Sequence, residues 1–60
     1  MIQNLPKDLV MLLSFINLKL RDYYSSLASL CEDLQVEEKE ICERLALIDY
    51  EYDPQKNQFV

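Results

Sequence analysis

The residue types that could carry out chemistry are few, and the two cysteines, Cys31 and Cys42, are the first to consider. A nucleophilic Cys or Ser usually needs a positioned base, most often His, and the chain contains no His. The usual zinc sites also need His or more than two thiolates. Cys31 falls on the predicted core face of a helix, where a thiol is typically inert, and Cys42 should be half-buried and the more accessible of the two. We therefore predict no catalytic residue, no metal site and no cofactor.

A polar seam on the first predicted helix is the second candidate for chemistry. It consists of Asn17 and Arg21, with Lys19 and Asp22 close by in the sequence. An Arg guanidinium can bind a carboxylate or a phosphate through paired hydrogen bonds. The alternative is an ordinary helix surface, on which Lys19 pairs locally with Asp22 or Tyr23. The residues alone leave both interpretations open.

The stretch from Ser26 to Leu45 contains both cysteines, and its pattern is that of a helix-turn-helix unit. Apolar residues recur at helical spacing over about residues 27–34 and again over about 37–48, and a turn of about three residues is placed at Gln35. Ser25 or Ser26 can cap the first of these helices. Such turns often contain Gly, because the backbone adopts a left-handed conformation there. Gln35 occupies that position, which weakens the match.

The charge of this unit argues against the nucleic-acid binding that its pattern suggests. The second helix would offer four acids against two bases, namely Glu37, Glu38, Glu40 and Glu43 against Lys39 and Arg44. The whole chain carries a net charge of −5, and binding to nucleic acid depends on positive charge facing phosphates. A winged-helix-type nucleic-acid-binding regulator is therefore the disfavoured alternative function. We expect instead a compact helical fold whose partners are proteins.

The first helix, predicted over residues 8–23, has two apolar stripes. Its core-facing stripe holds Leu9, Leu12, Leu13, Ile16, Leu20 and Tyr23. Its second stripe holds Met11, Phe15 and Leu18, which lie on a different side of the helix. Either the C-terminal segment folds over the second stripe, or the stripe is an interface with another copy of the chain or with another protein. We favour the interface, and so predict a non-catalytic interaction module that self-associates through this helix.

The C-terminal segment, residues 50–60, reads as a β-hairpin. Tyr50, Glu51 and Tyr52 alternate in a manner typical of a strand, residues 53–57 form a turn around Pro54, and residues 58–60 return as a second strand. A hairpin after a helix-turn-helix corresponds to the wing of a winged-helix domain, and we expect its aromatic residues to pack on the helices. The predicted fold is thus mainly α: a three-helix, helix-turn-helix-like core with a C-terminal hairpin.

Size and composition suggest one small domain over residues 1–60 and a cytoplasmic location. The apolar run of the first helix is interrupted by Ser14, Asn17 and Lys19, well short of the roughly 20 residues needed to span a bilayer, and no signal-peptide pattern is recognisable. In the reducing cytoplasm a Cys31–Cys42 disulfide would be unexpected, although it is possible in principle. The complete absence of Gly excludes Gly-rich phosphate-binding loops.

Short motifs spread over nearly the whole chain resemble those of a family of short bacterial proteins, about 60 residues long, that is classified only as a domain of unknown function. The matching segments are residues 5–8, 11–14, 16–17, 19–22, 24–27, 30–31, 50–52 and 57–59. The resemblance implies a bacterial, cytosolic domain that stands alone. It implies no activity and no site residues. At a coarser level the chain is similar to winged-helix domains, from which it departs in its acidic second helix, its Gly-free turn and its acidic wing.

Overall fold

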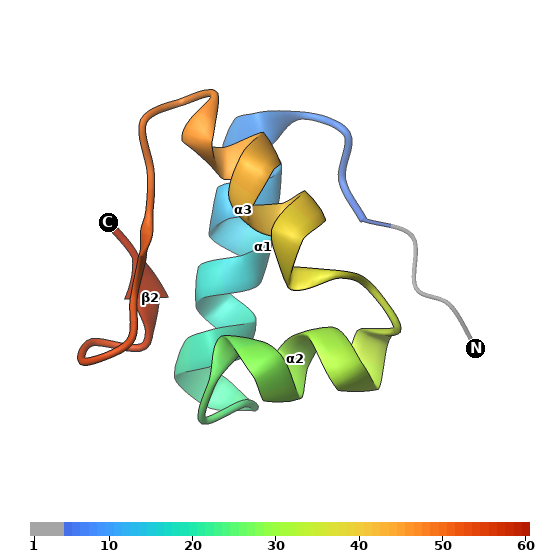
Figure 1. Ribbon diagram of the computed structural model, residues 1–60, viewed down its shortest axis with the longest axis vertical. Coiled ribbons are helices and arrows are strands. Elements are labelled where there is room, and N and C mark those ends of the chain that lie inside the picture. The colour runs from blue at the N-terminus through green and yellow to red at the C-terminus, as the bar shows by residue number, and fades with distance from the viewer. Residues whose placement is uncertain (1–4) are drawn as a thin grey trace.

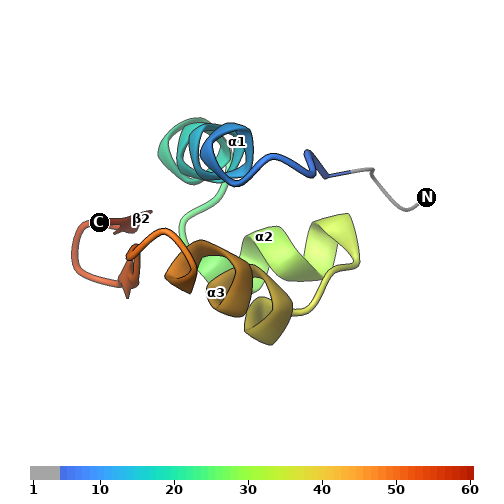
Figure 2. The ribbon, with the colours of Figure 1, turned by 90° about the horizontal axis from the view of Figure 1, so that it is seen from above.

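The computed structural model describes residues 5–60, and within this range the chain folds as three helices followed by a two-stranded hairpin (Figure 1). The elements are α1 (Leu9–Asp22), α2 (Leu27–Leu34), α3 (Glu38–Ala46), β1 (Tyr52–Asp53) and β2 (Gln58–Phe59). Seen from above, α1 forms one layer while α2 and α3 form the other (Figure 2). The predicted fold class is confirmed, and the predicted helix bounds agree to within one or two residues. The first four residues of the predicted domain lie outside the described range.

Side chains cap the first two helices at their N-termini. The Asp8 carboxylate accepts hydrogen bonds from the backbone N–H groups of Val10 and Met11, at 2.9 and 3.1 Å. The Ser26 hydroxyl accepts one from the N–H of Ser29 at 3.1 Å. These bonds satisfy donors that have no partner inside the helix, and they explain why the chain enters α1 and α2 at these residues.

One apolar core lies between the two layers. It consists of Leu12, Ile16, Leu20, Leu27, Leu30, Cys31, Leu34, Ile41, Leu45 and Phe59. Tyr23, predicted to belong to the core stripe of α1, is instead 69% exposed. The helical period no longer directs its side chain, because α1 ends at Asp22 and Tyr23 has left the helical conformation. Its ring contacts the Lys19 ammonium, which lies 4.7 Å from the ring centroid.

Gln35 adopts the left-handed conformation that the helix-turn-helix turn requires, with φ 60° and ψ 44°. The N–H groups of Gln35 and Val36 bond to the carbonyls of Glu32 and Cys31, which is the Schellman arrangement at a helix C-terminus. Asp49, with φ 65°, ends the α3 segment through the same pattern of bonds. Gln35 departs from the sequence pattern of such turns but adopts their backbone geometry, at the steric cost of a non-Gly residue with positive φ.

The hairpin is antiparallel, with Tyr52 opposite Phe59. The rings of these two residues pack with their centroids 5.5 Å apart, and Phe59 is part of the core. The Asp53 carboxylate accepts hydrogen bonds from the N–H groups of Gln55 and Lys56, which shapes the loop between the strands. As predicted, aromatic side chains attach the hairpin to the helices.

Arg44 on α3 holds the segment that leads into α1. Its guanidinium donates to the backbone carbonyls of Pro6 and Lys7, both at 3.0 Å. The spacing of Glu40 and Arg44 is that of a favourable helix pair, but the ion pair found among residues 5–60 is the one between Arg21 and Asp22. Two carbonyls that converge on one guanidinium compete with a single exposed carboxylate for the Arg44 side chain.

Candidate functional site

Asn17, predicted as part of a polar seam, joins α1 to the hairpin. Its side-chain oxygen accepts a hydrogen bond from the Phe59 N–H at 2.8 Å, and its side-chain NH₂ donates to the Phe59 carbonyl at 3.2 Å. Phe59 sits in a position of the antiparallel ladder whose backbone groups face away from β1, because Glu51 and Val60 exchange the neighbouring pair of bonds. The Asn17 amide therefore acts like the peptide group of a third strand and completes the outer edge of β2.

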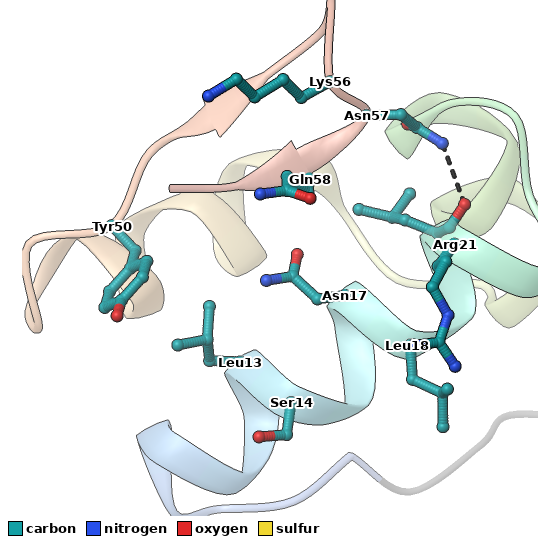
Figure 3. Close-up of a pocket in the computed structure, with 10 residues that line it drawn as sticks. Leu13, Ser14, Asn17, Leu18, Arg21, Tyr50, Lys56, Asn57 and Gln58 are labelled. Carbon is teal, nitrogen blue, oxygen red and sulfur yellow. Dashed lines mark hydrogen bonds between the residues drawn. The ribbon is translucent and has the colours of Figure 1, made fainter.

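A second amide, that of Asn57, ties the hairpin to the end of α1. Its NH₂ group donates to the carbonyls of Leu20 and Tyr24, at 3.0 and 2.9 Å, and the first of these bonds is drawn in Figure 3. Its oxygen accepts from the Tyr52 hydroxyl at 2.6 Å, and that hydroxyl accepts from the N–H of Leu27 at 3.2 Å. The network joins the C-terminus of α1, the N-terminus of α2 and the hairpin.

Between α1 and the hairpin lies a groove with a volume of about 700 Å³. Its lining residues are Leu13, Ser14, Asn17, Leu18, Leu20, Arg21, Tyr50, Lys56, Asn57 and Gln58. Figure 3 shows Arg21 at the rim on the α1 wall and Lys56 on the hairpin wall. Among these lining residues there are two cationic side chains and no carboxylate, on a chain whose net charge is −5. Within residues 5–60, we therefore take this groove as the candidate site for binding a ligand.

Arg21, the second member of the predicted seam, does not share the structural role of Asn17. Its Nε and Nη2 atoms donate to the two carboxylate oxygens of Asp22, at 3.0 and 3.1 Å. The hydrogen bond from Arg21 lowers the pKa of Asp22. The guanidinium carries five N–H donors in all, of which Asp22 engages two. The seam thus divides into an anchor for the hairpin and a cation that lines the groove while paired with Asp22.

The predicted second stripe of α1, which we call the outer stripe (Met11, Phe15 and Leu18), is not covered by the hairpin. Met11 is 62% exposed and Leu18 44% exposed, while Phe15 is half-buried at the margin of the core. The hairpin packs against the Asn17 side of α1 instead. The Lys19 ammonium lies 5.4 Å from the centroid of the Phe15 ring. Of the two alternatives that the sequence leaves open, coverage of the stripe by the C-terminal segment is therefore not found for Met11 and Leu18, which stay exposed.

The outward face of α3 presents the acidic surface that the sequence predicts. Glu38, Lys39, Glu40 and Glu43 are all exposed, whereas Ile41 and Leu45 are buried against the core. In a helix-turn-helix protein that binds DNA this face lies in the major groove. In that position the three carboxylates would repel the DNA phosphates, and only the Lys39 ammonium would attract them.

The two cysteines are free thiols in the structure. Cys31 is buried and Cys42 half-buried, as predicted. Burial raises the pKa of the Cys31 thiol to about 11, with smaller contributions from the negative charge of Glu38 and from Cys42. Burial likewise raises the pKa of Cys42. A raised pKa lowers the thiolate fraction, and the thiolate is the reactive form.

Comparison with known proteins identifies the family. The family model described as a domain of unknown function, DUF4250, matches residues 6–59. The chain belongs to this family. No curated protein and no solved structure matches it significantly. In the described part of the domain, no helix has the length and apolar character needed to cross a bilayer, and no three acidic or thiol side chains are grouped as ligands for a metal ion.

Two residues of the predicted polar seam line the groove on α1, whereas the hairpin residues that line it were not predicted as a site. Asn17 and Arg21 were identified on α1, but Lys56, Asn57 and Gln58 were interpreted as an ordinary turn and strand. Asn57 did carry a usable signal, since Asn tolerates the left-handed conformation found here at φ 53°. Its three side-chain hydrogen bonds could not be inferred, because two of them reach residues more than 30 positions away.

Proposed function

We propose that this domain is a non-catalytic protein-interaction module that self-associates through the outer stripe of α1. The observation that carries the proposal is the exposure of Met11 and Leu18 on a helix whose opposite face forms the core. Val10, the residue before Met11, is also 63% exposed. Met is adaptable in packing and enriched at protein interfaces. Contiguous apolar side chains of this kind on a small domain mark contact surfaces.

The distribution of charge supports a second copy of the chain as the partner. Residues 27–46, which include α2 and α3, hold six acidic and two basic side chains, whereas residues 5–26, which include α1, hold two acidic and three basic ones. The negative charge of the domain is thus concentrated away from α1. Two copies that meet through α1 would bring together their least repulsive surfaces.

An antiparallel pairing of two α1 helices about a two-fold axis would place Met11 of one copy near Leu18 of the other. The apolar surface is small, so the dimer belongs to the class of weak, transient interfaces. We therefore expect dissociation on dilution, with a Kd on the order of micromolar or weaker.

The experiment is sedimentation velocity over a dilution series of the natural chain and two variants. Met11→Asp places a charge in the outer stripe, and Leu47→Asp places the same charge at a site beyond α3 that is 76% exposed. We expect the natural chain and Leu47→Asp to pass from dimer to monomer on dilution, and Met11→Asp to stay monomeric throughout. A natural chain that is monomeric at millimolar concentration, or a Met11→Asp variant that dimerises normally, would exclude the proposal.

Nucleic-acid binding is the second candidate, which the helix-turn-helix pattern with its hairpin suggests and the acidic face of α3 disfavours. A duplex titration at low salt tests it, because electrostatic binding is strongest there. We expect no shift at tens of micromolar protein. Binding that weakens as salt is added would instead support the nucleic-acid function.

A further inference from the structure

The groove between α1 and the hairpin adjoins the outer stripe, with which it shares Leu18, and its lining suggests a second binding function. Its α1 wall runs from Leu13 to Arg21, about 12 Å along the helix axis. That length accommodates roughly three to four residues of extended chain. The opposite wall is formed by residues of the hairpin (Figure 3). The dimensions suit a short peptide segment that lies along the groove.

The polar lining is divided between groups already satisfied and groups that are free to bind. The side-chain amides of Asn17 and Asn57 are engaged with backbone groups of the hairpin and of α1. The side chains of Ser14 and Gln58 make no hydrogen bond among residues 5–60, and Lys56 forms no ion pair there. Ser14 and Gln58 can therefore donate to and accept from a peptide backbone, while Lys56 can meet a negative charge.

We propose that this groove binds an extended acidic segment of a partner protein, with carboxylates paired to Arg21 and Lys56. A neighbouring apolar side chain of the segment lies against Leu13 and Tyr50, which line the groove away from Arg21 (Figure 3). The charge argument is local: the lining carries two cations and no acid, although the chain as a whole is acidic. The Nε and Nη2 atoms of Arg21 are bonded to Asp22, so a carboxylate of the segment would bind the remaining N–H groups of the guanidinium or displace Asp22.

A carboxylate fits this site better than a phosphate does. Phosphate sites in proteins are typically built from successive backbone N–H groups at a Gly-rich loop or a helix N-terminus. The chain has no Gly, and the α1 wall is taken from the middle and C-terminal half of its helix. The groove therefore offers side chains rather than a nest of backbone donors.

The test is an NMR titration of the ¹⁵N-labelled domain at low salt with the peptide acetyl-Leu-Glu-Leu-Glu-amide. We expect the largest shifts at the amides of residues along the groove, such as Ser14, Tyr50 and Gln58. Arg21→Gln combined with Lys56→Gln should weaken binding about fivefold or more, since each exposed ion pair contributes modestly. Lys39→Gln on the outer face of α3 removes the same charge and should leave binding unchanged.

Asp22→Asn is predicted to act in the opposite direction. It releases the guanidinium of Arg21 from its present partner and should tighten binding about twofold or more. A role of Arg21 in folding alone would not produce this gain. The Met11→Asp variant should bind the peptide as the natural chain does, so that failure of self-association and failure of the groove can be distinguished.

Three outcomes would overturn the proposal. The peptide acetyl-Leu-Gln-Leu-Gln-amide could bind equally well, which would remove the role of the carboxylates. Inorganic phosphate could produce the same shifts at the same concentration, which would make the site a general anion site. Finally, the acidic peptide could cause no shift at millimolar concentration.

Discussion

Helices α1 and α3 both bury one apolar face, yet the faces they expose have opposite chemistry. The outer side of α1 presents Met11 and Leu18, and the outer side of α3 presents carboxylates around Lys39. The buried faces are alike because both supply Leu and Ile to one core. The exposed faces differ because no packing requirement acts on them.

The inner faces of these helices set the geometry of the fold, whereas the outer faces carry the residues that are free to contact other molecules. The inner faces of α2 and α3 produce a helix-turn-helix unit, complete with a left-handed residue at Gln35. The outer face of α3 lacks the positive charge that this geometry uses in DNA-binding proteins. The exposed apolar side chains Met11 and Leu18 lie on α1 instead, where the hairpin does not cover them.

The largest loss of stability should come from a substitution on the buried face of α1, when it is compared with one on the exposed face. Leu12→Ala removes a fully buried side chain and should cost about 2–5 kcal/mol. That loss approaches the whole stability of a domain of this size, roughly 3–5 kcal/mol, so the variant should be largely unfolded in circular dichroism. Met11→Ala, on the exposed face, should lower the unfolding free energy by less than about 0.5 kcal/mol. Equal losses in urea titrations would contradict the division of faces.

The next largest loss of stability should come from removing the side-chain hydrogen bonds by which α1 holds the hairpin. Asn17→Ala removes both side-chain bonds to the Phe59 backbone and should destabilise the domain by about 1–3 kcal/mol, because two part-buried groups lose their partner. Gln58→Ala, on the exposed side of the same strand, is the matched control and should cost little. The measurement is hydrogen exchange of the Phe59 amide together with urea unfolding. Unchanged protection of that amide in Asn17→Ala would show that Phe59 packing alone attaches the strand.

A smaller loss of stability should distinguish the capped N-terminus of α1 from the N-terminus of α3. Asp8→Ala removes the cap of α1 and should cost about 1 kcal/mol. Glu37 makes no capping hydrogen bond within the described residues, so Glu37→Ala should be close to neutral, whereas Glu37→Ser should gain a few tenths of a kcal/mol. Thermal unfolding of the three variants provides the comparison, and an equal loss at Glu37 would contradict it.

Asp49 adopts a left-handed conformation at the end of α3. Asp49→Gly should stabilise the domain by about 0.5–1 kcal/mol, because Gly adopts positive φ without the steric cost of a Cβ atom. Asn57→Gly should destabilise the domain despite a similar φ, since it removes the bonds to Leu20 and Tyr24. Urea titrations of the two variants should move in opposite directions.

The smallest effect at neutral pH concerns the thiols packed between α2 and α3. Because the folded pKa of Cys31 is raised to about 11, its contribution to stability is fully present below the unfolded pKa of about 9. That contribution is lost as the pH rises from about 9 towards 11. We expect alkylation of Cys31 to be slower than that of Cys42 at pH 8, and both to accelerate in urea. Faster labelling of Cys31 in the folded domain would contradict its burial.

Several features of the fold could be predicted because they depend on neighbours in the sequence. Caps at Asp8 and Ser26 act over two or three residues, and the apolar period of α2 fixes which side is buried. The failures have a local cause as well: Tyr23 was assigned to the core by extending a helical period one residue beyond the end of the helix. The sequence predicts Asn17 and Arg21 as a polar seam, and both line the groove on α1. It predicts no site among the hairpin residues that line the opposite side.

The sequence by itself determined the three helices, the hairpin, the acidic face of α3 and the second apolar stripe of α1, since composition and periodicity specify these directly. The tertiary structure decided that Asn17 bonds to Phe59, that Arg44 bonds to Pro6 and Lys7, and that the outer stripe stays open. The first two depend on side chains that bond to backbone groups about 40 residues away in the chain. The partner of such a side chain is set by how the packed elements meet, and no local pattern records it.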